Sequence, residues 1–434
     1  MKRPPLSRED IVRLDRAHVW HPYTPVDTWE KATPIVVARA EGSSFYEADG
    51  TRYLDGNSSW WVASLGHGHP RLVRVLREQV ETLVHCPLAG IAHEPSSALA
   101  AELVRVAPPG LERVFYSDDG STAVEVAVKI ALQTWQNRGA PQKTRFVALD
   151  GAYHGDTVGA SSLGGVEVFR RPYASVLFEC VHAPFPEPAA YARAFEAIRD
   201  LVAREHETIA AVVVEPLVQG AAGMRMYDAE YLRALRELTT EHDVLLIVDE
   251  VFAGYGRTGT MFACEQAAVT PDVMCIGKAF ATMFPMAATL VTGAIYDSFR
   301  GSAERALWYG HTFCGNPLGA TLAREVLAIY EDEQVVAQVR AKAPRITKAF
   351  ERLLELPGVA RVRSLGMIGA ADLEGAGGYL GQAGWRVYEE ARKRGAYLRP
   401  LGNTVYVCPP LVISDRDLDE LLGIVEESVR AVLR

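Results

Sequence analysis

The sequence has 434 residues, of which 49% are hydrophobic, and a formal net charge of −9 at pH 7. This length supports a large core, arranged as two domains or as one large domain with a smaller partner. The acidic balance argues against nucleic acid as a partner, because phosphate-binding surfaces usually carry an excess of Lys and Arg.

Further features of the sequence favour a soluble protein of the reducing cytoplasm. No apolar run approaches the roughly 20 residues that cross a bilayer, so no membrane association is expected. The six cysteines are scattered without a Cys-x-x-Cys pair, which argues against a disulfide framework or a zinc site. The first ten residues, MKRPPLSRED, contain no apolar segment, so a secretory signal is not expected.

The first 55 residues have the composition of turns and short strands, and residues 56–70 read GNSSWWVASLGHGHP. Trp60 and Trp61 lie together in this polar setting, and an indole N–H needs a hydrogen-bond acceptor once it is buried. The pair is therefore either a corner of the core or the wall of a binding pocket.

Two amphipathic helices are predicted next. Residues 120–135 predict a helix in which Thr122 and Glu125 have the spacing of a capping box. Residues 69–85 predict a helix whose apolar face contains Leu72, Leu76, Val80 and Leu83.

Short apolar runs alternate with amphipathic stretches through the middle of the chain, which is typical of an α/β domain with a mostly parallel sheet. The last hundred residues return to helix, loop, strand (404–410) and helix, so the two ends of the chain could join into one smaller domain. Loops are predicted at 137–145, 183–191 and 374–384. Buried strands are predicted at 210–216, 244–250 and 272–277.

Two charged residues stand where predicted strands end. Asp249 follows the apolar run 244–248, and Lys278 follows the strand 272–277. In open α/β sheets, ligands gather outside the carboxyl ends of the strands. Taken singly, Asp249 can be a helix N-cap and Lys278 a solvated loop cation. Together they are the two groups that pyridoxal phosphate requires: a lysine that forms a Schiff base and a carboxylate that keeps the pyridine nitrogen protonated.

A phosphate site is predicted where the second helix begins. Gly120 permits close approach of the backbone, Ser121 supplies a hydroxyl, and the helix dipole favours an anion. Asp118 and Asp119 are unfavourable neighbours for a phosphate, so their side chains are expected to turn away or to pair locally. The alternative is an ordinary capped helix.

The turn GHTFCGNP (310–317) offers a further donor at Thr312, with a plain loop as the alternative. The segment DGAYHGDT (150–157) adds a tyrosine, a histidine and an aspartate. The ring of Tyr153 can stack on a pyridine ring, or it can be a core tyrosine. His154 is interpreted as a loop residue, and no metal site is expected because no second histidine stands at ligand spacing.

Four of these segments resemble the class III pyridoxal-phosphate-dependent aminotransferases: DDGSTAVEVAVKIA, VDEVFAGYGRTG, PDVMCIGKAF and GHTFCGNPLGA. The resemblance extends over residues 20–410 and implies a fold-type-I enzyme with pyridoxal 5'-phosphate as cofactor. It implies a large domain with a central, mostly parallel sheet (59–334) and a small α+β domain built from both termini (1–58 and 335–434). It also implies a homodimer whose active sites lie at the subunit interface.

Three more segments are most similar to the members of this family that act in biotin synthesis: HVWHPYTP, GNSSWWVASLGHGHP and LRPLGNTVYVCPP. This likeness implies conversion of 8-amino-7-oxononanoate to 7,8-diaminononanoate, with S-adenosylmethionine as amino donor. Arg399 can hold the carboxylate of this long acid while aromatic walls desolvate its methylenes, although it can also be a surface arginine. Arg257 is expected to hold loop geometry or a donor carboxylate.

Residue roles are carried over from the family by matching position. The resemblance implies three catalytic residues: Lys278, Asp249 and Tyr23. It implies that the cofactor is bound by Gly120, Ser121, Tyr153, Asp249, Lys278, His311 and Thr312, with Thr312 reaching in from the neighbouring subunit. It implies that the substrates are bound by Tyr23, Trp60, Trp61, Tyr153, Asp156, Lys278, Gly310 and Arg399.

Two departures from the family pattern keep alternatives open. His311 stands where many members that use S-adenosylmethionine have proline, so lysine is an alternative donor, and Asp119 stands where serine is frequent. An ω-amino acid–pyruvate aminotransferase on the same fold is the nearest alternative function. A non-catalytic binding protein is a remote alternative, because such a scaffold has no need of a Schiff-base lysine.

Overall fold

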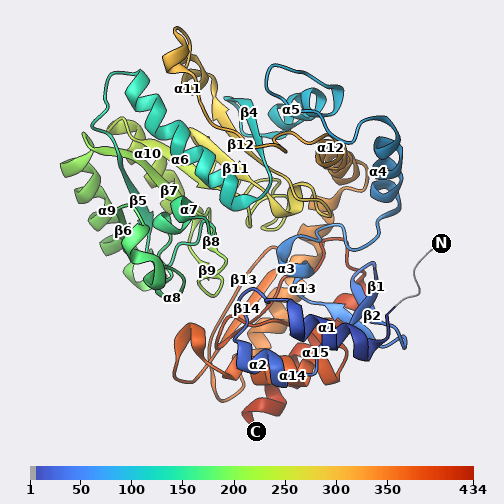
Figure 1. The fold of residues 1–434 in the computed structure, drawn as a ribbon. Helices are drawn as coiled ribbons and strands as arrows, with labels where there is room; N and C mark the ends of the chain where they lie inside the picture. Colours follow the sequence, from blue (N-terminus) through green and yellow to red (C-terminus); the bar gives the residue numbers. More distant parts are fainter. Residues whose placement is uncertain (1–5) are drawn as a thin grey trace.

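The computed structural model describes residues 6–434, which form a large part around a seven-stranded sheet and a smaller part that contains both ends of the described chain (Figure 1). The expected α/β architecture is confirmed. The first five residues, part of the N-terminal stretch without an apolar segment, lie outside the described residues.

The central sheet has the strand order β4-β12-β11-β10-β7-β5-β6. Strand β12 runs antiparallel to both of its neighbours, whereas β11, β10, β7, β5 and β6 pair in parallel. The three strands predicted from apolar runs are confirmed as β7, β10 and β11. The bounds are β4 (Leu111–Ser117), β5 (Arg145–Leu149), β6 (Cys180–Ala183), β7 (Ile209–Val214), β10 (Leu245–Asp249), β11 (Val273–Ile276) and β12 (Ala287–Thr292).

Both faces of this sheet are buried, which explains why its strands are apolar without alternation. In β10, Leu245 and Ile247 belong to the core cluster that contains α6, whereas Leu246 and Val248 belong to the cluster that contains α10. The large part contains α4 (Pro70–Thr82), α5 (Glu94–Val106), α6 (Gly120–Asn137), α7 (Val158–Leu163), α8 (Glu167–Arg170), α9 (Tyr191–Glu205), α10 (Ala229–Glu241), α11 (Gly293–Asp297), α12 (Pro317–Asp332) and the ribbon β8 (Val218–Gln219)–β9 (Arg225–Met226).

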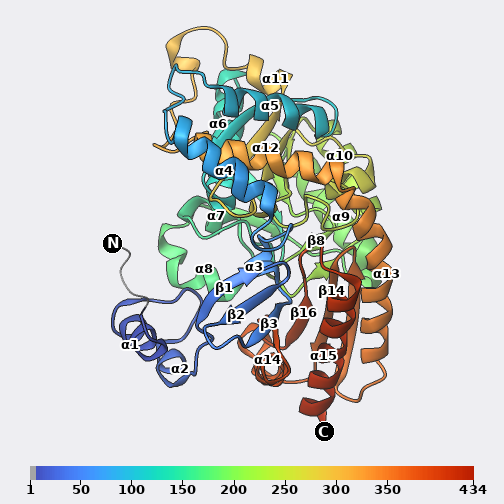
Figure 2. The same ribbon diagram turned by 90° about the vertical axis from the view of Figure 1, so that its right-hand side faces the viewer.

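The two ends of the chain meet in the smaller part, where β15 pairs in parallel with β3 and places Tyr397 opposite Asp55. Long helices α13 and α15 pack against each other on one side of this part (Figure 2). One sheet contains β1 (Val37–Glu41), β2 (Ser44–Glu47), β3 (Arg52–Asp55) and β15 (Ala396–Tyr397); another contains β13 (Val359–Leu365), β14 (Ile368–Leu373) and β16 (Thr404–Val407). The helices are α1 (Arg8–His18), α2 (Val26–Lys31), α3 (Ser58–Trp61), α13 (Val335–Leu353), α14 (Ala383–Lys393) and α15 (Asp415–Leu433).

Several local predictions differ from the structure. The N-terminal segment contains helices α1 and α2 in addition to the expected strands, and the C-terminal segment contains three strands (β13, β14 and β15) and a helix (α14) that were not predicted. Helix α4 buries Leu72, but Val80 on the predicted apolar face is 51% exposed. The face is therefore only partly covered within one chain.

The predicted capping box of α6 is wrong. Asp119 is the N-cap: its carboxylate accepts from the N–H of Thr122 at 2.8 Å, and the Thr122 hydroxyl oxygen accepts from the N–H of Asp119 at 3.0 Å. Glu125 instead accepts from the hydroxyl of Thr157 and the N–H of Gly159. The expectation that Asp119 pairs locally is confirmed.

Within residues 6–434, no helix combines the length and apolarity needed to cross a membrane. The same residues contain no group of three or more His, Cys, Asp or Glu side chains placed to hold a metal ion.

Replacing Asp119 with alanine is expected to loosen the first turn of α6, because loss of an N-cap costs roughly 0.5–2 kcal/mol. Hydrogen–deuterium exchange at the amides of Thr122 and Ala123 should quicken several-fold. Asp119→Asn keeps an acceptor oxygen and should exchange nearly as slowly as the wild type. Unchanged exchange in Asp119→Ala would show that the cap does not hold this turn.

Candidate active site

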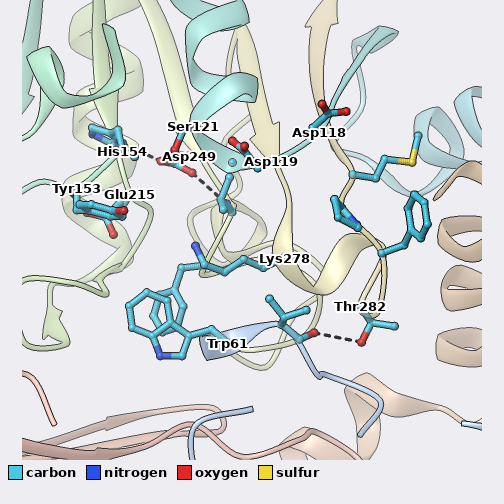
Figure 3. Close-up of a pocket in the computed structure, with 18 of the residues that line it drawn as sticks. Trp61, Asp118, Asp119, Ser121, Tyr153, His154, Glu215, Asp249, Lys278 and Thr282 are labelled. Atoms are coloured by element: carbon cyan, nitrogen blue, oxygen red, sulfur yellow. Dashed lines mark hydrogen bonds and ion pairs between the residues drawn. The ribbon is translucent and has the colours of Figure 1, made fainter. Parts of the chain in front are cut away.

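A cavity of about 470 Å³ lies at the carboxyl ends of the parallel strands of the central sheet (Figure 3). Asp249 and Lys278, which the sequence places at two strand ends, both line it. Many of the lining residues come from the ends of five strands: Asp118–Ser121 after β4, Tyr153–Gly155 after β5, Glu215 after β7, Asp249 at the end of β10 and Lys278 after β11. The lining is completed by Trp61, Val62, Val251, Phe252 and residues 282–286.

Asp249 is buried and held from two sides. One carboxylate oxygen accepts from the N–H of Val251 at 3.0 Å, and the other lies 2.8 Å from Nδ1 of His154. Burial opposes protonation of His154, but the carboxylates of Asp249 and Glu215 outweigh this effect and raise the pKa of the imidazole. The site therefore favours a charged His154 that fixes the Asp249 carboxylate.

Lys278 projects into the same cavity from the turn that follows β11, where its own φ is +47°. Its Nζ lies 5.3 Å from the centre of the Trp61 ring. Burial lowers the pKa of this amine, while the carboxylates of Asp249 and Glu215 partly oppose the shift. A lysine with a lowered pKa is more often neutral and thus a better nucleophile and base.

Glu215 is a third ionisable group in this cavity. It accepts hydrogen bonds from the N–H of Tyr153 at 3.0 Å and of Gly220 at 2.9 Å. Burial raises the pKa of Glu215 to about 7, with His154 opposing the shift and Asp249 adding to it. This carboxyl group changes its protonation state near neutral pH.

The N-terminus of α6 faces the cavity, as a phosphate site requires (Figure 3). A Cβ on Gly120 would lie 2.5 Å from the Cγ1 of Val251, so the packing admits only glycine here. The hydroxyl oxygen of Ser121 accepts from the N–H of Asp156 at 3.2 Å and leaves its own O–H free to donate. Asp118 pairs with His311, with 3.4 Å between the carboxylate and Nδ1.

The residues present fit pyridoxal phosphate. Lys278 would supply the amine that bonds to the cofactor, Asp249 would supply a fixed anion for its ring nitrogen, and the start of α6 would supply donors for its phosphate. The Nε2 atom of His154 is buried without a hydrogen-bond partner, and the glycine at position 120 keeps space at the helix start.

Trp60 and Trp61 lie on α3, which is a single left-handed turn because φ is positive at all four of its residues: Ser58 (47°), Ser59 (48°), Trp60 (68°) and Trp61 (74°). Left-handed helical backbone costs an L-residue roughly 1–2 kcal/mol. Trp61 is only 5% exposed, lines the cavity and donates from Nε1 to the hydroxyl of Tyr406 at 3.0 Å. Trp60 is 41% exposed and contacts Tyr23 edge-to-face, with ring centroids 5.5 Å apart.

Tyr23, Tyr153 and Asp156 form a cluster of hydroxyl and carboxylate groups. Both tyrosines donate to Oδ2 of Asp156, from Tyr153 at 2.7 Å, and the two hydroxyl oxygens lie 3.2 Å apart. Burial raises the pKa of both tyrosines, so both hydroxyls stay protonated near neutral pH. The structure thus joins residues from the N-terminal segment and from the loop after β5.

Arg399 lies between two indole rings, with its guanidinium carbon 5.3 Å from the centre of Trp60 and 5.2 Å from that of Trp385. Its Nη2 donates to the carbonyl of Tyr23 at 2.9 Å. Arg257 is buried and donates to the carbonyl of Pro409 at 2.7 Å and to the hydroxyl of Ser58 at 3.4 Å. These contacts match the loop-holding role expected for Arg257.

Gly310, His311 and Thr312 are not among the cavity-lining residues of their own chain. Gly310 and Thr312 are exposed, and His311 is half-buried beside Asp118. Their expected roles in cofactor and substrate binding remain predictions that need a second subunit.

Sequence reasoning missed three residues of this region. His154 lies in a loop, as interpreted, but its burial against Asp249 was missed, because the loop after β5 folds over the end of β10. Glu215 follows the apolar run 210–214 of the predicted strand 210–216, just as Asp249 follows the run 244–248, and this pattern could have identified it. No sequence pattern around Trp385 indicates its role, since only the tertiary fold brings α14 next to Arg399.

A buried lysine and a buried carboxylate at neighbouring strand ends, on a sheet with an antiparallel β12, fit a pyridoxal-phosphate-dependent enzyme of fold type I. Residues 26–429 match the family model for class-III aminotransferases. The chain therefore belongs to the class III aminotransferases and is a pyridoxal-phosphate-dependent transaminase.

Individual relatives agree with this assignment. An adenosylmethionine-8-amino-7-oxononanoate aminotransferase of Geobacter sulfurreducens is 40% identical over 449 aligned positions, covering 99% of each chain. The crystal structure of the protein of that name from Methanocaldococcus jannaschii has a TM-score of 0.94 and 33% identity, covering 98% of this chain and 99% of that one. An omega transaminase from Pseudomonas jessenii in complex with PMP has a TM-score of 0.92 and 27% identity, with coverages of 97% and 98%.

The raised pKa of Glu215 predicts a pH-dependent stability difference between the wild type and Glu215→Gln. In the unfolded chain this carboxyl group loses its proton near 4.5, whereas in the folded chain it keeps the proton up to about 7. Its stabilising contribution is therefore complete below pH 4.5 and is lost as the pH rises through 7. Glutamine does not titrate, so the cofactor-free variant should gain up to ~3 kcal/mol over the wild type between pH 5 and 8.

The measurement is urea unfolding of both proteins across this pH range. A stability difference that stays constant with pH would mean that Glu215 titrates at its ordinary value.

Proposed function

We propose that the protein transfers an amino group to 8-amino-7-oxononanoate and forms 7,8-diaminononanoate, a step of biotin biosynthesis. The amino group of the donor replaces the keto oxygen of the acceptor, and the donor leaves as the corresponding oxo compound. The proposal is supported by the names of relatives that match this chain over nearly its full length at 40% identity and by the residues around Arg399.

The single observation that carries the substrate assignment is the arrangement of Trp60, Tyr23 and Arg399 near the cavity. The acceptor has a long apolar chain that ends in a carboxylate. A guanidinium can bind a carboxylate through two parallel hydrogen bonds, and aromatic walls desolvate methylenes. The contacts of Arg399 with Trp60 and with the Tyr23 carbonyl bring these two properties together.

Lys278 and Asp249 would perform the chemistry that both halves of the reaction share. When bound, pyridoxal phosphate supplies an electron sink for the carbon that bears the amine. The Asp249 carboxylate would keep a proton on the ring nitrogen, and the Nζ atom of Lys278 would carry the proton to and from the substrate carbon. Trp61 and Phe252, whose rings pack 4.5 Å apart, would shield Nζ from water on one side.

S-adenosylmethionine is the proposed amino donor, in keeping with the names of the relatives. Lysine is the alternative, since His311 occupies a position where proline is frequent among users of S-adenosylmethionine. The proposed location is the cytoplasm.

The proposed assembly is a homodimer with active sites at the interface. In one chain, Thr312 is exposed and does not line the cavity, and its neighbours Trp308 and Phe313 are 81% and 52% exposed. Exposed large apolar side chains of this kind favour coverage by another subunit. The arrangement leaves Thr312 available to a phosphate in the partner's cavity.

A half-reaction screen tests the function. The lysine-bound cofactor form is mixed with S-adenosylmethionine, lysine or common ω-amines, and the loss of its visible absorbance is followed. The resulting amine form is then mixed with 8-amino-7-oxononanoate or pyruvate. Rapid recovery of absorbance with 8-amino-7-oxononanoate is expected; recovery with pyruvate alone would instead assign an ω-amino acid–pyruvate aminotransferase.

Arg399→Ala is expected to raise the KM for 8-amino-7-oxononanoate by roughly 10- to 100-fold, because a charge-assisted hydrogen bond contributes about 1.5–3 kcal/mol. The cofactor should stay bound, since Arg399 does not line the cavity around Lys278. Steady-state kinetics with the ketone and its decarboxylated analogue provide the measurement. If the variant loses no affinity for the acid relative to the analogue, Arg399 does not bind the carboxylate.

A further inference from the structure

The left-handed turn Ser58–Trp61 needs an explanation, since four consecutive L-residues adopt a backbone that each of them disfavours. Such conformations persist only where the surrounding structure over-determines them. The turn begins three residues after β3 and ends at the tryptophan that lies beside Lys278.

The buried carboxylate of Asp55, the last residue of β3, makes four contacts with this segment and the loop behind it. Oδ1 accepts from the N–H of Asn57 at 3.3 Å and of Ser59 at 3.0 Å. Oδ2 accepts from the hydroxyl of Ser59 at 3.0 Å and lies 2.9 Å from Nε2 of His67. The Asp55 side chain is 0% exposed, so water does not replace these contacts when they are lost.

The C-terminal segment holds the other side of the turn. The hydroxyl of Ser58 donates to the carbonyl of Cys408 at 2.6 Å, and the indole of Trp61 donates to Tyr406. The side-chain oxygen of Asn57 accepts from the N–H of Arg399 at 2.6 Å. The same short segment therefore sets the positions of both tryptophans and of the Arg399 backbone.

We propose that Asp55, supported by His67, is a positioning residue that holds the left-handed turn and thereby places Trp60 beside Arg399 and Trp61 beside Lys278. Asp55 touches neither the cavity nor Arg399 and acts through the tryptophans. This proposal rests on the proposed function for the identity of the ketone, but the geometry of the turn is independent of the substrate. It also accounts for the spacing in DGNSSWWVASLGH, in which Asp55 and His67 bracket the two tryptophans.

The test compares Asp55→Ala with Asp372→Ala. Asp372 is a carboxylate in β14 that bonds to Arg363 and Thr404 in the same part of the molecule, so its loss also weakens the structure. Asp55→Ala is expected to raise the KM for the ketone at least tenfold, whereas Asp372→Ala should lower the thermal midpoint and leave the KM unchanged. Equal KM values in the two variants would overturn the proposal.

Two further variants separate positioning from general stability. In the Asp55→Ala background, Ser59→Gly should recover most of the lost affinity, because glycine adopts positive φ readily. Asp55→Asn retains an oxygen for the two N–H groups and should lie close to the wild type. A Ser59→Gly change that recovers nothing would show that Asp55 does not act through the backbone of the turn.

If Asp55→Ala does not fold, Ser59→Pro tests the same turn by a second route. Proline fixes φ near −65°, which is incompatible with the turn, and Ser59 is only partly buried. The same rise in KM is expected, and an unchanged KM would overturn the proposal.

If the wild type itself does not accept 8-amino-7-oxononanoate, the proposed function fails. The rate with the donor and acceptor that it does use, together with the visible absorbance of the Lys278-bound cofactor, then tests Asp55 in the same variants. Unchanged values in both would overturn the positioning role.

Discussion

Asp249 brings a carboxylate to the end of a fully buried strand, where an unpaired charge would be strongly unfavourable. The imidazole of His154 and the N–H of Val251 stabilise it there, and the cavity-facing side remains for a cationic ring nitrogen. The charge of Asp249 shifts the pKa values of its neighbours. It opposes the lowering of the Lys278 pKa by burial, and it helps to raise the pKa of Glu215. The central sheet makes the arrangement possible, because five strand ends converge on one cavity.

The proposed recognition of the acceptor depends on a second constraint, the meeting of the two chain ends in one sheet. The pairing of β3 with β15 brings the Trp60–Trp61 turn next to Arg399, which is more than three hundred residues away in the sequence. Tyr23 joins them through its carbonyl and its ring. The proposed pair Lys278 and Asp249 thus lies on the large part, whereas the groups proposed to select the acceptor come mostly from the smaller part.

Sequence patterns predicted the structure correctly where neighbouring residues in the chain determine it. Strands β7, β10 and β11 are short runs of apolar residues, and Asp249 and Lys278 could be identified because polar residues at strand ends are conspicuous. The capping box failed because Asp119–Thr122 has the same spacing as Thr122–Glu125, and only the tertiary contacts of Glu125 with the loop after β5 distinguish them. His154 and Trp385 could not be predicted, since their partners lie on other elements.

The choice between core and pocket for the two tryptophans had no single answer. Trp61 is both, since it is buried against Phe252 and lines the cavity, whereas Trp60 faces Tyr23 and Arg399. The polar residues around the pair are explained by the turn, in which Ser58 and Ser59 bond to Cys408 and Asp55. The sequence of this segment contains no pattern that predicts four consecutive residues with left-handed backbone.

The most direct measurement is the rate of the amino-donor half-reaction in Asp249→Asn, followed through the visible absorbance of the lysine-bound cofactor. Asparagine keeps the size and most hydrogen bonds of Asp249 but removes the charge that holds a proton on the ring nitrogen. The cofactor should remain bound while the half-reaction slows by at least about a hundredfold, in the range of lost acid–base catalysis. A variant that binds the cofactor and reacts within a few-fold of the wild-type rate would contradict the role assigned to this carboxylate.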